Sequence, residues 1–122
     1  MTGGGESGTI KIEDIEIGRS VGAKAKNYDV EYKPTKEVFH FVEGTKIQNV
    51  HVFAGYKTSF PLDEMTSQGL SEQIGGDPDK WQHCKGTGII DFYGEERPAE
   101  VHWFQEETQG KHKFKIKRWL DD

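Results

Sequence analysis

The sequence predicts an α+β domain in which one or two helices pack on one face of an antiparallel β-sheet. A chain of 122 residues is long enough for one hydrophobic core. Ile and Val together number 16, whereas Leu and Ala number 7, so strand-forming apolar residues outnumber helix-forming ones. In the last third of the chain, short turns separate alternating segments, which is typical of an antiparallel meander.

The N-terminal part contains a leader followed by short strand signals. Residues 1–8 hold four glycines and are expected to form a flexible Gly-rich leader, and residues 9–122 a single α+β domain. Alternating isoleucines over residues 9–17 predict one bent strand or two short strands. Val30 and Tyr32 alternate with charged residues before Pro34, which ends any strand there.

The middle of the chain predicts further strands and the best helix candidate. An apolar patch over residues 37–42 is followed by a turn, and β-branched residues over 47–53 predict a strand. A partial helical stripe from Pro61 to Ile74 predicts a helix, capped by Ser59 and stopped by Gly75 and Gly76. Residues 77–81 predict another helical turn.

Three strands are expected at the C-terminus, over residues 88–93, 99–105 and 111–120. Because side chains alternate across a strand, Val101 and Trp103 share one face and Glu100, His102 and Phe104 share the other. By the same alternation, Phe114 and Ile116 face one side of the sheet, and Lys113, Lys115 and Lys117 face the other side. The apolar faces are expected to pack on the helical part of the chain, leaving Glu100 and His102 beside a row of lysines.

The composition excludes several classes of protein. No apolar run approaches the roughly 20 residues that span a bilayer, and no secretory signal pattern is present. The single cysteine, Cys84, cannot form an internal disulfide or a Cys-rich zinc site. The net charge of −5 argues against nonspecific DNA coating, but it is compatible with a local basic site.

The basic run at the C-terminus allows two interpretations. Residues 111–118 carry five Lys or Arg residues and no acid, which suits an anionic ligand such as RNA phosphate. The same pattern is typical of a solvated strand on which lysines protect a sheet edge, and the charge pattern alone favours this second interpretation. His102 adds weight to the first, because a histidine beside Glu100 suits proton transfer near neutral pH.

A second cluster covers residues 80–86. His83 can serve as a base and Lys85 as a phosphate contact at the edge of a loop. Trp81 suits either stacking on a nucleic-acid base or anchoring the loop in the core, and the core role is favoured. Burial rather than nucleophilic chemistry is expected for Cys84, because adjacent residues such as His83 and Cys84 rarely point at one atom.

Metal and cofactor binding are not expected. The five histidines show no HxxxH or HExxH spacing, and no phosphate-loop, dinucleotide or GxSxG motif occurs. A small-molecule or metal site built from His51, His83 and His102 is retained as an alternative.

Four stretches of the chain, at residues 44–55, 81–86, 99–105 and 110–119, carry a family resemblance. They resemble C-terminal domains appended to phage minor head proteins, including the MuF-type fusions of prophages. Some of these appended domains are assigned to the barnase–EndoU–colicin–RelE class of nucleases. The resemblance covers roughly residues 40–120.

The resemblance implies a toxin-like effector domain that cleaves RNA without metal by acid/base catalysis on the open face of its sheet. It implies His102 as acid/base, His83 as a second acid/base, Glu100 as the residue that orients His102, and Lys85, Lys113 and Lys115 as phosphate-binding residues. The implied partners are RNA and an immunity protein or a phage head protein, and the implied location is the cytoplasm or the virion, without membrane contact.

A catalytically silent binding or structural domain of a phage or prophage protein is the alternative. The net negative charge supports this alternative, because free ribonucleases of this kind are often basic.

Overall fold

A computed structural model describes residues 8–18 and 26–121 of the chain. Within these ranges the chain forms eight β-strands, one α-helix and one 3₁₀-helix. In chain order the elements are β1 (Ile10–Lys11), β2 (Ile15–Glu16), β3 (Asp29–Tyr32), β4 (Glu37–Phe41), β5 (Lys46–Gly55), α1 (Glu64–Gln73), η2 (Pro78–Lys80), β6 (Gln82–Phe92), β7 (Glu95–Glu106) and β8 (Gly110–Trp119). Residues 1–7 of the expected leader lie outside the described residues.

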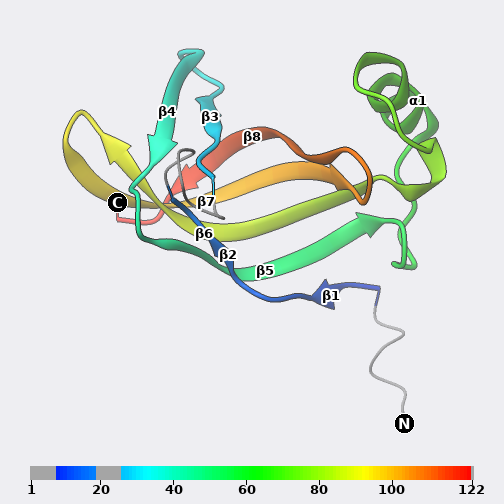
Figure 1. Cartoon of the computed structure of the whole chain (residues 1–122), viewed down its shortest axis with the longest axis horizontal. Coiled ribbons are helices and arrows are strands. Elements are labelled where there is room, and N and C mark those ends of the chain that lie inside the picture. Colours follow the sequence, from blue (N-terminus) through cyan, green and yellow to red (C-terminus); the bar gives the residue numbers. More distant parts are fainter. Residues whose placement is uncertain (1–7, 19–25, 122) are drawn as a thin grey trace, which may run out of the picture.

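Five strands close into a β-barrel (Figure 1). Strands β3, β4, β6, β7 and β8 pair in this order, each antiparallel to the next. The barrel closes because β8 returns to pair with β3 in parallel, with Val30 opposite Phe114. The expected α+β class is therefore wrong. The apolar strand faces cover one another inside the barrel, so they need no layer of helices.

The long strand β6 joins the barrel to an open sheet. One edge of β6 pairs with β7 along its whole length. The other edge pairs first with β5, over Gln82 to Thr87, and then with β4 at Ile90 and Asp91. Strand β5 carries the short strands β1 and β2 on its far edge. One half of the molecule is thus a closed barrel, and the other half is a sheet of β5, β6, β7 and β8 (Figure 1).

The core lies inside the barrel and continues along the inner face of this sheet. Trp103, Ile90 and Val101 are fully buried, and the Trp103 ring stacks on Phe114 with 5.0 Å between centroids. Strand β6 contributes little side-chain volume here, because Gly88 faces the ring of Phe41. A Cβ atom at Gly88 would lie 2.5 Å from Phe41 Cε1, so the close contact requires glycine.

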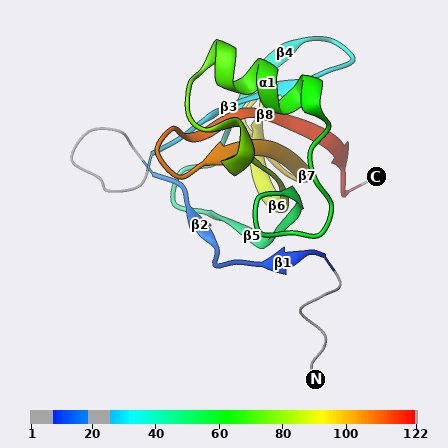
Figure 2. The ribbon, with the colours of Figure 1, turned by 90° about the vertical axis from the view of Figure 1, so that its right-hand side faces the viewer.

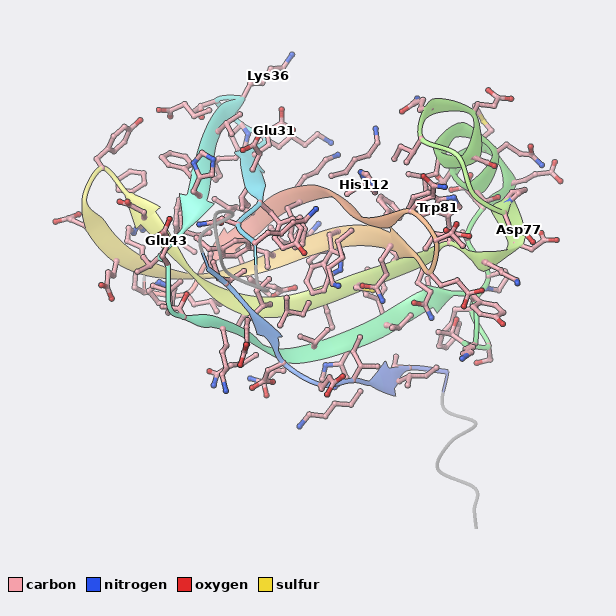
Figure 3. All side chains as sticks on the ribbon, viewed as in Figure 1. Glu31, Lys36, Glu43, Asp77, Trp81 and His112 are labelled. Atoms are coloured by element: carbon pink, nitrogen blue, oxygen red, sulfur yellow. The ribbon has the colours of Figure 1, made fainter. Side chains whose placement is uncertain are left out.

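Helix α1 covers one end of the sheet, and the buried Trp81 lies on the segment that leads from it into β6. The N-cap of α1 is Asp63, whose side chain accepts a 3.0 Å hydrogen bond from the Thr66 amide, so the expected cap at Ser59 is wrong. Trp81 is 1% exposed and donates from Nε1 to the carbonyl of Gly75, which confirms its role as a core anchor. Figure 3 shows Trp81 and His112 between α1 and the strands.

Several predictions of local elements in the C-terminal half are confirmed, although the predicted fold class is wrong. The three C-terminal strands pair as an antiparallel meander, and the expected helical turn at residues 77–81 is η2. The predicted helix over residues 61–74 is α1 in a shorter form. No helix in the described ranges has the length and apolar character needed to cross a membrane.

We predict that Gly88→Ala lowers the free energy of unfolding by about 1–3 kcal/mol, because the added methyl group must displace the buried Phe41 ring. Gly69→Ala is the matched control. Gly69 lies inside α1 with no atom within 4 Å of the added Cβ, so this change should raise stability by up to about 1 kcal/mol. Chemical denaturation measures both, and equal stabilities of wild type and Gly88→Ala would contradict the packing described.

Candidate functional site

Polar and aromatic side chains gather on the outer face of the open sheet. Residues paired across neighbouring strands point to the same side, so the register of β6, β7 and β8 places them in rows. Three rows lie side by side: His83, Phe104 and His112; Lys85, His102 and Lys115; and Thr87, Glu100 and Arg118. The register therefore brings five of the predicted site residues onto one face: His83, Lys85, Glu100, His102 and Lys115.

Two irregularities in β8 change which cations face this surface. The pairing with β7 shifts between Val101–Ile116 and Glu100–Arg118, so Lys117 has no partner and Arg118 lies opposite Glu100. A second shift includes Lys113, whose φ of 61° departs from strand geometry. Strict alternation of Lys113, Lys115 and Lys117 therefore does not continue across these bulges, although all three lysines line one groove.

Lys113 contacts helix α1 rather than Glu100. Its ammonium group donates a 2.9 Å hydrogen bond to Gln73 Oε1 at the end of α1. Of the three predicted phosphate-binding lysines, Lys85 and Lys115 flank His102 in register, whereas Lys113 reaches toward the helix.

His102 is held by a carboxylate that is itself held by an arginine. His102 Nε2 donates to Glu100 Oε2 at 2.7 Å, and Arg118 contacts Glu100 Oε1 at 2.7 and 2.8 Å. Partial burial opposes the charged form of Glu100, but the hydrogen bonds from His102 and Arg118 outweigh it and lower the pKa of the carboxyl. The network fixes the orientation of the His102 ring, and Arg118 is a member that sequence reasoning missed.

His83 lies within an aromatic cluster beside His102. Its ring stacks on Phe104 at 4.1 Å between centroids, lies 4.4 Å from Phe53 and 5.8 Å from the His102 ring. Burial is the main cause that lowers the pKa of His83 to about 4, and the charges of His102, Lys115 and Lys117 add to it. His83 is therefore neutral at pH 7, and the described residues supply no hydrogen-bond partner to its ring.

The lysines of this face are not neutralised by neighbouring acids. In the described part of the chain, no carboxylate lies within 4 Å of the ammonium groups of Lys85, Lys115 or Lys117. The Lys85 ammonium lies 5.8 Å from the centre of the Phe53 ring. A chain of net charge −5 thus keeps a local concentration of positive charge on one surface.

A groove of about 730 Å³ runs along this surface. One wall comes from the β3–β4 hairpin, which contributes Tyr32, Lys33 and Pro34. The other lining residues are His83, His102, Phe104, Lys113, Lys115, Ile116, Lys117, Arg118 and Trp119. Figures 1 and 2 show that the hairpin and α1 rise from the same side of the sheet, with β8 between them.

The described residues do not assemble a metal site. Among them, no group of three or more His, Cys, Asp or Glu side chains is arranged to hold a metal ion. His51 lies opposite Lys85 in register, and its Nδ1 contacts the carbonyl of Asn49. Cys84 is buried in the core, where desolvation raises the pKa of its thiol to about 12, so it stays protonated.

Comparison with protein-family models, with curated proteins and with solved structures finds no match to this chain. The resemblance to phage head-protein domains therefore stays a prediction, and the function is argued from the geometry of the groove.

We predict that His83 makes stability depend on pH between about 6.5 and 4. Its pKa is lowered on folding, so the unfolded chain binds more protons in this window and stability falls as pH falls. Between pH 7 and pH 4, the free energy of unfolding of the wild type should fall by about 2 kcal/mol more than that of His83→Phe. Urea denaturation at several pH values measures this. Glu100 and the other carboxyls titrate in both proteins, so equal pH slopes would contradict a buried neutral His83.

Proposed function

We propose that this chain is a metal-independent endoribonuclease, acting as a toxin-like effector domain of phage origin. One observation carries the proposal: two histidine rings 5.8 Å apart line a groove that also presents unneutralised lysines. Acid/base cleavage of RNA needs a proton acceptor, a proton donor and positive charge around one phosphate. His83, His102 and Lys115 bring these functions to one surface.

The proposed reaction transfers the phosphate within the RNA strand. Neutral His83 takes the proton of a ribose 2′-hydroxyl, and the 2′-oxygen forms a bond to phosphorus. The bond from phosphorus to the 5′-oxygen breaks, and His102 donates a proton to that oxygen. The products are a 2′,3′-cyclic phosphate and a free 5′-hydroxyl. Lys115 and Lys85 stabilise the extra negative charge of the phosphorane, and Glu100 positions His102.

A binding domain without catalysis is the second candidate, and one observation favours it. A pKa of about 4 makes His83 a weak base at neutral pH, where an efficient general base has a pKa near the working pH. The same desolvated ring, stacked on Phe104, is well suited to contact a nucleic-acid base without reacting.

Cleavage of labelled total tRNA in the presence of EDTA tests the proposal. We predict that wild type cleaves and that His102→Ala lowers the rate by about 100-fold or more, because the acid is lost. Lys115→Ala should also lower the rate, because phosphorane charge is less stabilised. His40→Ala and Lys46→Ala are matched controls on β4 and β5 outside the groove, and they should cleave like wild type.

Circular dichroism checks that each variant is folded. If folded wild type leaves RNA intact, the nuclease proposal fails and the binding role takes its place. If His102→Ala cleaves as fast as wild type, the assigned site is wrong.

A further inference from the structure

The groove is lined by aromatic rings as well as by cations. We infer that its substrate is an unpaired RNA strand whose bases stack on these rings, and that double-helical RNA is excluded. This inference rests on the proposed function, because it takes RNA as the ligand. What it adds is the form of RNA that the groove accepts.

The first stacking surface is formed by the rings around Phe104. His83 lies nearly parallel to Phe104, with 16° between the ring planes, and Phe53 packs against the other rings at 4.4 Å from His83 and 5.3 Å from His102. Each ring in this group is therefore fixed by its neighbours. A rigid aromatic surface gains stacking energy from a base at little cost in side-chain entropy.

A second pair of aromatic rings, Tyr32 and Trp119, lines the groove and also packs against the core. Their ring centroids lie 5.7 Å apart. The guanidinium of Arg97 lies 4.0 Å from the centre of the Trp119 ring, and Arg97 in turn makes two 3.0 Å hydrogen bonds to Asp121. This contact helps to hold the Trp119 ring in place.

Cations line the same groove: Lys33, Lys113, Lys115, Lys117 and Arg118. A strand that follows them places its phosphates along these cations and its bases on the aromatic rings. In a double helix the base faces are stacked on one another and hidden, so neither surface could be used. The combination of cations and partly buried aromatic rings in one groove therefore favours single-stranded RNA, as in single-strand-binding grooves.

Binding of 2′-O-methyl RNA tests the inference separately from cleavage, because such RNA has no 2′-hydroxyl proton to remove. Fluorescence anisotropy with wild type should give at least tenfold tighter binding to a short unstructured oligomer than to a duplex of the same length. Phe104→Leu should weaken binding of the oligomer about tenfold, because one stacking surface is lost. The matched control is Phe60→Leu, because Phe60 is 51% exposed and lies outside the groove. This variant should bind the oligomer with the affinity of the wild type.

Tryptophan emission reports on the second pair of rings. Trp81 and Trp103 are fully buried, whereas Trp119 lines the groove. Bound oligomer should quench the emission of wild type, and Trp119→Phe should lose this quenching. Inorganic phosphate binds only to the cations, so it should leave the emission unchanged.

The outcomes separate the two proposals. Equal affinity for oligomer and duplex, equal loss of affinity in Phe104→Leu and Phe60→Leu, or unquenched Trp119 emission would overturn the two-surface inference, even if RNA is cleaved. Selective binding of the oligomer with quenching would support it, even if natural RNA is left intact and the nuclease proposal fails.

Discussion

Three residue pairs between β3 and β8 close the barrel, and the groove depends on the same pairs. Without this parallel contact, β6, β7 and β8 would form an open sheet whose apolar face, including Phe114 and Trp103, would need another cover. The contact also places the β3–β4 hairpin beside Lys115, so Tyr32 becomes a wall of the groove. One non-local pairing thus sets both the burial of the core and the shape of the surface opposite it.

The sequence predicts the local elements but not the closure of the sheet. Alternation and turns indicate the C-terminal meander, and the glycines at 75–76 mark the end of the helical region. Strand β3 has only four residues, and its alternation of Val30 and Tyr32 with charged residues does not reveal its partner. Alternation identifies the apolar face of a strand, but the cover of that face depends on contacts between distant segments.

Strand β6 shows a second limit. Its first half contains His83, Cys84 and Lys85, which are predicted from the sequence at the edge of a loop rather than in a strand. In the structure Gly86 and Gly88 are strand residues, because larger side chains would collide with Ile47 and Phe41. A glycine that makes room for a ring across the core cannot be told from a turn glycine without the tertiary structure.

The candidate site was partly visible in the sequence. His102 and Glu100 share a face by alternation, and the register adds His83, Lys85 and Lys115 to that face. Arg118 was missed because the bulge that turns it toward Glu100 has no sequence signal. Phe104 shares the alternation of His102 and was thus detectable, whereas the contributions of Tyr32 and Trp119 depend on closure of the barrel.

The two faces of strands β6, β7 and β8 differ in what they contact. Inward residues such as Val101 and Trp103 hold the barrel together, whereas outward residues such as His102 and Phe104 form the groove. Exchange of an outward side chain leaves the packing of its inward neighbours intact. Outward positions can therefore change ligand preference at little cost in stability, whereas inward positions are constrained by packing, including Ile116 and Trp119, which also line the groove.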